Sequence, residues 1–319
     1  MGVVIILHNR VSRFISRETI NWVISTSLKG VSQVILIENA ATGFIILIAI
    51  MVSSLPMGII ALLSSITGTL IGKLGGADGK SVNQGIYGYN SVLTGMALSL
   101  FLRGDNRWII ALAGAAIAAI FTAAMIHIMR QVGLPVLTFP FIILTWFLLL
   151  TAYRLVSFKI DPKLAPQSLA NWTLNIKGET NWLDGAVNGM GQIFFLDNNW
   201  SGILLYIAIF WAGWRFGLYA IIGNASALLT AYALGGEHSL IFMGHYGYNA
   251  ILTMIAVAAV YKEDHRYALL YGVLSACLTV PITASIATWL LPYGLPALTM
   301  PFVFCTWLLL GAMKSLRSI

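Results

Sequence analysis

The residues GIYGYNSVLT at positions 85–94 recur as GHYGYNAILT at positions 244–253, an offset of 159. A second block, GLPVLTFPF at 133–141, recurs as GLPALTMPF at 294–302 with an offset of 161, so about two residues are inserted between the blocks in the second half. A weaker third pair restores the offset of 159. It matches Gln33, Glu38 and Asn39 to Gln192, Asp197 and Asn198. Three blocks in one order at nearly one offset predict two copies of one unit.

The composition predicts that lipid forms part of the surroundings of this chain. Hydrophobic residues make up 59% of the 319 positions, charged residues make up 9%, and the mean hydropathy is +0.86. A soluble domain carries about a quarter charged residues. We therefore expect one membrane domain over residues 1–319, with a first repeat at 21–158, a polar linker at 159–180 and a second repeat at 181–319.

The net charge of +7 does not indicate a nucleic-acid partner, because the basic residues are scattered at the ends of apolar stretches, as at Arg10, Arg103 and Lys314. Lys and Arg gather at such ends in membrane proteins, on the cytoplasmic side. Both termini are basic, which predicts that both are cytoplasmic and that the number of crossings is even. Residues 1–17 are predicted to form an amphipathic segment on the membrane surface.

Each unit contains several apolar stretches, some of them shorter than the ~20 residues that a full crossing requires. In the first unit they lie near residues 20–30, 42–53, 56–72, 86–102, 108–129 and 135–153. The stretch after Gly30 is too short and too polar to cross, so we predict a re-entrant half-helix there. Five crossings in each unit would give the two units opposite orientations and ten crossings in total. Units related in this way usually place a solute site between them at mid-membrane.

Repeated polar residues are candidates for that site, since a polar side chain inside a membrane is costly unless it is paired or faces water. Gln33 and Gln192 either bond to neighbouring backbone and steady a helix break, or line a path for a neutral solute rich in N–H and C=O groups. Thr138 and Thr299 follow a proline. Each hydroxyl either satisfies a carbonyl that the proline leaves free, or faces the axis as a second polar station.

Repeated residues with large apolar side chains form a further set of candidates. In each unit a Tyr and a Leu lie four residues apart on one helix face, and another residue follows the glutamine by three positions. The set comprises Tyr89 and Leu93, Tyr248 and Leu252, and Leu36 and Phe195. These residues either pack in the core or form an apolar slot that admits a flat molecule by its faces.

The other repeated polar residues have structural or ionic interpretations. Asn90 and Asn249 are predicted to cap the start of the helix after the Gly-x-Tyr-Gly-Tyr turn. Glu38 and Asp197 are capping groups, ion-pair partners of a basic residue, or the cation site of an ion-coupled transporter. The histidines have no repeated partner and no third ligand, and the common protease, esterase and nucleotide-hydrolysis motifs do not occur. We therefore expect no metal site, no cofactor and no enzyme activity.

With its paired blocks the chain resembles the urea transporter family, over a range from about residue 20 to the end. The resemblance implies an all-α integral membrane protein, with ten transmembrane helices plus two re-entrant half-helices in two inverted repeats around a central pore. It also implies a homotrimer in the lipid bilayer, with passive, channel-like permeation of urea through a narrow filter in each protomer. The short tails suggest a bacterial member, located in the inner membrane.

The resemblance further implies roles for individual residues. Gln33 and Gln192 would start the half-helices and offer side-chain oxygens to urea at two outer stations. Thr138 and Thr299 would supply the hydroxyls of a central station. The walls would consist of Val34, Leu36, Tyr89 and Leu93 on one side and Ile193, Phe195, Tyr248 and Leu252 on the other. Leu36 departs from the family pattern, in which a Phe is usual, so one slot would be only half aromatic.

Other functions remain open at this point. A channel for another small neutral amide or for ammonia would share the architecture, although an ammonia channel is expected to carry paired pore histidines, and no histidine here is matched between the repeats. An ion-coupled small-solute transporter would use Glu38 or Asp197. An aquaglyceroporin would carry twin Asn-Pro-Ala motifs, and the dipeptide Asn-Pro does not occur.

Overall fold

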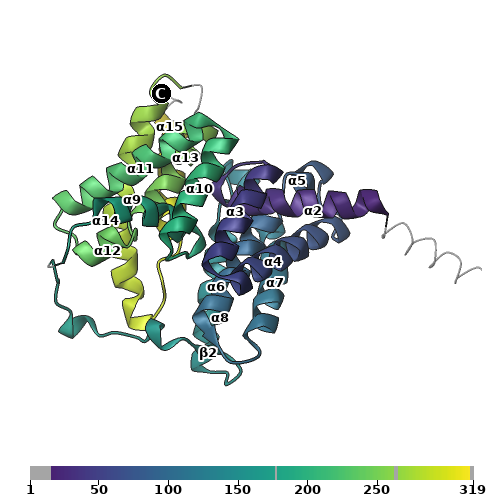
Figure 1. Ribbon diagram of the computed structural model, residues 1–319, viewed down its shortest axis with the longest axis horizontal. Coiled ribbons are helices and arrows are strands. Elements are labelled where there is room, and N and C mark those ends of the chain that lie inside the picture. Colours follow the sequence, from purple (N-terminus) through teal and green to yellow (C-terminus); the bar gives the residue numbers. More distant parts are fainter. Residues whose placement is uncertain (1–15, 177, 262–264, 317–319) are drawn as a thin grey trace, which may run out of the picture.

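Figure 1 shows the computed structural model, which describes residues 16–176, 178–261 and 265–316. In these ranges the regular structure is helical apart from one antiparallel pair of two-residue strands, β1 (Leu102–Arg103) and β2 (Lys159–Ile160). The all-α class predicted from the sequence is therefore confirmed. The amphipathic segment predicted at 1–17 lies almost wholly outside the described residues.

Every apolar stretch found in the first half forms a helix. The helices are α2 (Arg17–Ser32), α3 (Ala40–Ser53), α4 (Leu55–Leu74), α6 (Gly88–Phe101), α7 (Arg107–Val132) and α8 (Phe139–Leu150). A short 3₁₀ turn, η1 (Gln33–Ile35), follows α2, and a five-residue helix, α5 (Gly79–Asn83), precedes α6. Because these stretches are apolar almost throughout, the helices can be buried against one another on one side and exposed to lipid on the other.

The second half contains the same elements in the same order. They are α9 (Trp182–Gly191), η5 (Gln192–Phe194), α10 (Asn199–Ala212), α11 (Trp214–Ala233), α12 (His238–Phe242), α13 (Gly247–Ile255), α14 (Ala268–Leu290) and α15 (Met300–Leu316). A π-helix, η6 (Ala256–Tyr261), continues α13. The blocks that recur in the sequence therefore fold into the same local structures.

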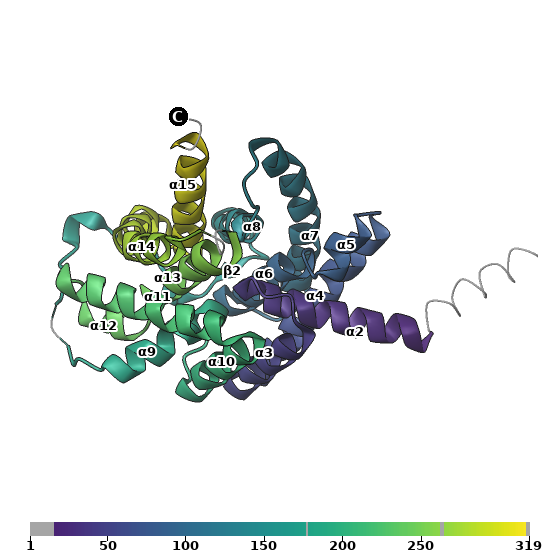
Figure 2. The ribbon, with the colours of Figure 1, turned by 90° about the horizontal axis from the view of Figure 1, so that it is seen from above.

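The two halves lie side by side. Seen from above, the first half, in purple and blue, occupies one side of the molecule, and the second half, in green and yellow, occupies the other (Figure 2). Helix α3 packs against α10, and α8 contacts α15. Each of these contacts joins two equivalent helices, so the halves present the same surfaces to each other.

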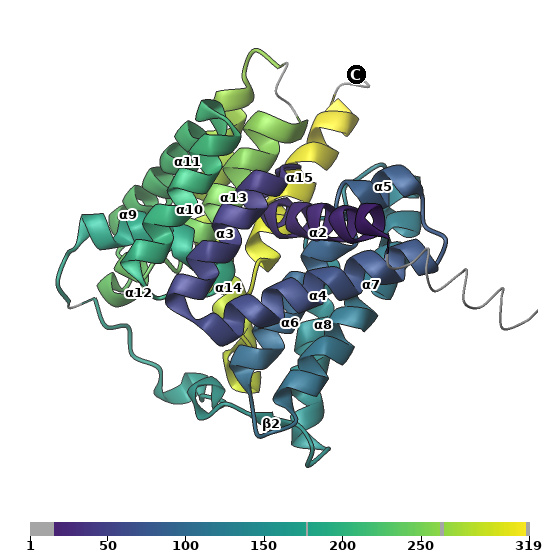
Figure 3. The same cartoon turned by 45° about the vertical axis from the view of Figure 1, so that its right-hand side comes forward.

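The polar segment between the halves runs along the outside of the molecule from β2 to α9 (Figure 3). Its start is anchored by an ion pair, in which a guanidinium nitrogen of Arg103 lies 2.6 Å from a carboxylate oxygen of Asp161. The backbone N–H of Lys163, together with Arg103, lowers the pKa of the Asp161 carboxyl below its usual value. The carboxylate is therefore charged at neutral pH, and the ion pair holds the linker against the end of α6.

Among the described helices, four are long and apolar enough to cross a membrane: α4, α7, α11 and α14. Two further pairs pass the same test as bent units, α2 with α3 at 75° and α9 with α10 at 77°. Helices α8, α13 and α15 are shorter apolar helices. These lengths fit a multi-pass membrane protein, and the division into ten crossings and two half-helices stays a prediction.

One local expectation is wrong. We predicted a half-helix after Gly30, with Gln33 at its start, but α2 continues to Ser32 and Gln33 stands at the C-terminal end of that helix. The chain then turns at Leu36, whose φ of 62° is left-handed, and α3 begins at Ala40. Gln192 and Phe195 have the same places at the end of α9, with a φ of 59° at Phe195. Helices α2 and α9 end at these places because a residue in the left-handed conformation cannot continue a right-handed helix.

Two glycines permit these bends. After the turn, α3 folds back so closely over α2 that a methyl group at Gly43 would overlap the backbone carbonyl of Leu28. A methyl group at Gly202 would meet the backbone carbonyl of Val187 in the same way. These two contacts are equivalent at the offset of 159.

Replacing Gly43 with Ala should therefore reduce the free energy of unfolding by roughly 1–3 kcal/mol, as for other overpacked sites. Gly202→Ala should behave alike. Thermal unfolding in detergent measures the effect, and Gly79→Ala is the matched control, because nothing lies within 4 Å of a methyl group at Gly79. Equal stability of the Gly43→Ala and Gly79→Ala variants would contradict this account of the bend.

Candidate functional site

The predicted site residues Thr138 and Thr299 lie in two loops without regular structure, one before α8 and one before α15. Gly133 and Gly294 end the preceding helices in the left-handed conformation, with φ of 64° and 61°. Leu137 and Leu298, one residue before the repeated threonines, both have a φ of 51°. A left-handed conformation costs a non-glycine residue of order 1–3 kcal/mol, and it persists only where surrounding contacts impose it.

The left-handed non-glycine residues form two equivalent pairs. Over the described ranges they are Leu36, Leu137, Phe195 and Leu298. Each of the four is either a predicted site residue or the direct neighbour of one. Backbone strain is thus concentrated where the sequence predicted the site.

Asn90 and Asn249 supply contacts that impose the loop conformation. The Asn90 amide nitrogen donates to the Leu137 carbonyl at 3.4 Å, and its oxygen accepts from the N–H of Phe141 at 3.3 Å. Asn249 makes the same two bonds, to the Leu298 carbonyl at 3.3 Å and from the N–H of Phe302 at 3.2 Å. The prediction that these residues cap their own helices is therefore wrong, since they hold the first turns of α8 and α15 instead.

Tyr89 and Tyr248 bind the same two carbonyls. The hydroxyl of Tyr89 donates to Leu137 at 2.6 Å, and the hydroxyl of Tyr248 donates to Leu298 at 2.6 Å. These bonds fix the orientation of both rings. Leu93 and Leu252, one turn further along the same helices, are completely buried.

The loops are also clamped across the two halves. The indole N–H of Trp146 donates to the carbonyl of Pro296 at 2.8 Å, and that of Trp307 donates to the carbonyl of Pro135 at 2.7 Å. Between these two bonds the hydroxyls of Thr138 and Thr299 lie 2.7 Å apart and hydrogen-bond to each other. A reciprocal set of contacts of this kind is the pattern that a two-fold axis produces.

The threonine pair does not match the first of the two interpretations given to these residues. Neither hydroxyl donates to a carbonyl that a proline leaves free; each is buried and bonded to its counterpart in the other half. A Thr hydroxyl has one proton and two lone pairs, so the pair retains acceptor capacity for a further hydrogen bond.

Beside Thr299 lies a cavity of about 220 Å³. It brings together six of the twelve predicted site residues, Leu93, Gln192, Ile193, Phe195, Tyr248 and Thr299. Asp197 and His245 also line it, together with Phe101 and Phe141. The cavity thus contains residues of both halves. Its polar groups are the Gln192 amide, the Asp197 carboxylate, the His245 imidazole and the hydroxyls of Tyr248 and Thr299, and the other walls are apolar.

The other predicted residues lie outside this cavity, and of these Tyr89 binds the loop before α8. Val34 is buried, and Leu36 is half-buried at the turn after Gln33. The Gln33 amide nitrogen donates to the carbonyl of Gln84 at 3.0 Å. We call Gln33, Leu36 and Glu38 the first station, and Gln192, Phe195 and Asp197 the second station.

Both glutamines keep their side-chain oxygen available. The amide nitrogen of Gln192 donates to a carboxylate oxygen of Asp197 at 3.2 Å, as that of Gln33 does to a backbone carbonyl. Among the described residues no hydrogen bond uses the side-chain oxygen of either glutamine. Each station therefore presents a free acceptor for an N–H group.

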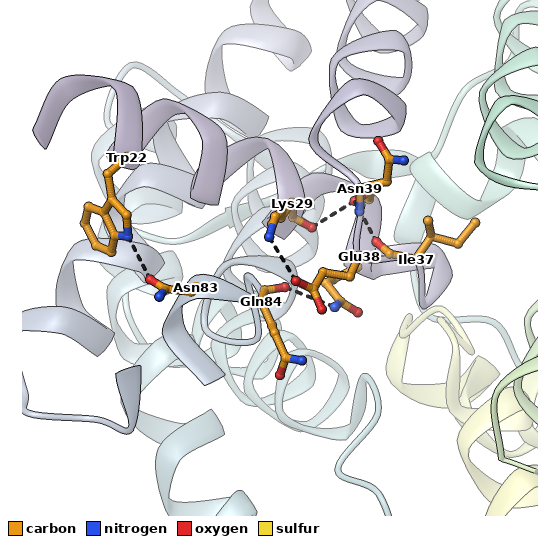
Figure 4. Close-up of polar contacts among 9 residues, drawn as sticks. Trp22, Lys29, Ile37, Glu38, Asn39, Asn83 and Gln84 are labelled. Atoms are coloured by element: carbon orange, nitrogen blue, oxygen red, sulfur yellow. Dashed lines mark hydrogen bonds and ion pairs between the residues drawn. The ribbon is translucent and has the colours of Figure 1, made fainter. Parts of the chain in front are cut away.

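The two stations differ in charge. Glu38 forms an ion pair with Lys29, with 2.9 Å between the ammonium nitrogen and a carboxylate oxygen (Figure 4). At the second station Asn188 occupies the place of Lys29, and its amide donates to the carbonyl of Phe242 instead. Asp197 therefore bonds to the neutral amide of Gln192 where Glu38 bonds to an ammonium group.

The comparisons with known proteins agree with this site. A model of the urea transporter family matches residues 24–314. The chain belongs to the urea transporter family. Urea transporter 1 of Capra hircus is 26% identical over 296 residues, which are 91% of this chain and 76% of the relative. Urea transporter 1 of Mus musculus is 26% identical over 288 residues, which are 89% of this chain and 75% of the relative.

Family membership makes the chain a multi-pass membrane transporter rather than an enzyme. The sequence did not single out Phe101, Phe141 or His245 as cavity residues of this transporter. His245 stands where the repeated block has Ile86, so this mismatch within the most similar block was a usable signal. Phe101 lies at the end of a helix, and no repeated motif contains it.

The clamp of the second loop is open to a direct test. Asn249→Ala removes the partner of the Phe302 N–H and one of the two donors to the Leu298 carbonyl, and a buried group left unsatisfied costs about 1–3 kcal/mol. Thermal unfolding in detergent should show that loss. Asn106→Ala is the control, because Asn106 is exposed and its side chain makes no capping bond. If both variants unfolded at the same temperature, the Asn249 side chain would not hold the loop.

Proposed function

We propose that the chain conducts urea passively, through a narrow path that runs from the first station past the threonine pair to the second station. The observation that carries the proposal is the Thr138–Thr299 hydrogen bond, which joins the two halves. Family membership supports urea as the solute.

The chemistry of the path suits a small neutral amide. Urea offers four N–H groups and one carbonyl oxygen. The Gln33 and Gln192 oxygens can accept N–H bonds, and the threonine hydroxyls can accept and donate. Apolar walls next to these groups exclude ions, because a bare charge would lose its hydration without compensation. Binding must also stay weak enough for urea to leave each station.

We also propose the finer architecture that the family resemblance implies: ten crossings, two re-entrant half-helices and two inverted repeats around a central pore. The equal order of elements and the reciprocal tryptophan bonds support two related halves. A homotrimer with one pore in each protomer, cytoplasmic termini and a bacterial inner membrane belong to the same proposal.

Purified protein in liposomes should accelerate urea flux with no ion gradient present. Stopped-flow light scattering after a step in urea concentration measures this flux, and empty liposomes give the baseline. Flux at the baseline would refute urea conduction. Flux that appeared only with a sodium or proton gradient would refute the passive mechanism and leave the substrate intact.

Replacing both threonines with Val removes the hydroxyls at nearly constant volume. The double variant should slow urea flux at least tenfold, because a lost hydrogen bond to a solute in an apolar path costs about 1.5 kcal/mol. Thr145→Val/Thr306→Val is the matched control, because these hydroxyls, further along the same helices, are buried and have no hydrogen-bond partner among the described residues. Wild-type flux in the Thr138/Thr299 double variant would remove the pair from the path.

An ion-coupled mechanism would need a carboxylate that is free to bind a cation. Glu38 is neutralised by Lys29, which leaves Asp197 as the candidate for coupling. Because we propose passive conduction, Asp197→Asn should retain urea flux within about threefold of wild type, with no dependence on sodium or pH gradients. A gradient-dependent wild-type flux that Asp197→Asn abolished would favour coupling.

A further inference from the structure

The two stations have different aromatic surroundings. At the second station the ring of Phe195 meets two rings of the first half, Phe101 at 5.7 Å between centroids and Phe141 at 6.4 Å. The first station has Leu36 in the place of Phe195, and therefore lacks one ring. Because Phe101 of the first half meets Phe195, the residue of the second half that corresponds to Phe101 is expected to face Leu36.

A π-helix determines that correspondence. Helix α6 has 14 residues from Gly88 to Phe101, whereas α13 and η6 together have 15 from Gly247 to Tyr261. A π-turn contains one residue more than an α-turn, because its hydrogen bonds join residues five apart. The offset of 159 thus becomes 160 within η6, and Tyr261 replaces Val260 as the counterpart of Phe101.

The second inserted residue lies in the following connection. Five residues, 102–106, join α6 to α7, and six residues, 262–267, join η6 to α14. The offset of 161 therefore begins at α14. One of the two insertions seen in the sequence is consequently a helical register change, and it selects which side chain ends η6.

The surroundings of Tyr261 agree with this correspondence. By this correspondence Tyr261 relates to Tyr89 as Phe101 relates to Tyr248, and the latter two share one cavity at the second station. η6 packs against α11, α14 and α15. Even so, 37% of the Tyr261 surface is exposed, and no hydrogen bond among the described residues uses its hydroxyl.

We propose that Tyr261 lines the first station opposite Leu36 and binds urea there through its hydroxyl. The inference rests on the proposed function. It identifies the ring that replaces the one missing at Leu36, and it makes the first station more polar than the second, where Phe101 has no hydroxyl. The π-helix is the element that turns this side chain toward the path.

A conservative variant tests the hydroxyl. Tyr261→Phe should lower urea permeability about fivefold, the effect of one lost hydrogen bond of about 1 kcal/mol. Tyr293→Phe is the control, because its ring is 51% exposed and no hydrogen bond among the described residues uses its hydroxyl. Equal permeability of Tyr261→Phe and wild type would overturn the role of the hydroxyl.

A cysteine variant tests the location independently of the hydroxyl. In a background with Cys277→Ala and Cys305→Ala, Tyr261→Cys should react with a small cationic methanethiosulfonate from the aqueous phase, and the modification should block urea flux. Concentrated urea in the reaction should slow the modification at least twofold. Tyr293→Cys should tolerate modification without loss of flux.

The outcomes separate the two proposals. Without urea flux in the unmodified cysteine-free background, while that protein remains folded, the proposed function fails. With flux present, a Tyr261→Cys variant that does not react, or that reacts and still conducts normally, overturns the inference and leaves urea conduction intact.

Discussion

The loops before α8 and α15 leave the helical conformation inside the protein, and their residues Leu137, Thr138, Leu298 and Thr299 are buried. Unwound backbone buried in this way is stable only if protein groups satisfy it. Tyr89 and Asn90 bind the Leu137 carbonyl, and Tyr248 and Asn249 bind the Leu298 carbonyl. The rest of the site depends on these bonds, because they hold both leucines in a strained conformation and turn the next residue toward the other half.

That turn brings one half of the chain into contact with the other. Thr138 and Thr299 meet at 2.7 Å, and one tryptophan from each half binds the proline carbonyl of the opposite loop. The halves are nevertheless unequal around this centre. The first station has a neutralised carboxylate and Leu36, whereas the second has Asp197 and Phe195. A path for a neutral amide tolerates such differences, because its polar groups need only replace water as hydrogen-bond partners.

The sequence predicted those parts of the structure that occur in both repeats. Equal blocks must fold alike, so the helices and the threonine pair followed from the offsets. Two other features could not be predicted from the pattern. Asn90 lies in the first turn of α6, where a cap was expected, yet its side chain binds backbone groups of Leu137 and Phe141. These lie about 50 residues away, and only tertiary packing brings them close. The end of α2 at Gln33 depends on the left-handed turn at Leu36, a residue type that rarely adopts it.

Locating a bound solute tests the central claim most directly, that the path passes between the halves at the threonine pair. Crystals soaked in selenourea, a urea analogue with an anomalously scattering atom, would show where the molecule binds. Our account predicts anomalous peaks in a row, with sites adjoining Gln33, the Thr138–Thr299 pair and Gln192. Peaks confined to other places, with none between the two glutamines, would contradict it.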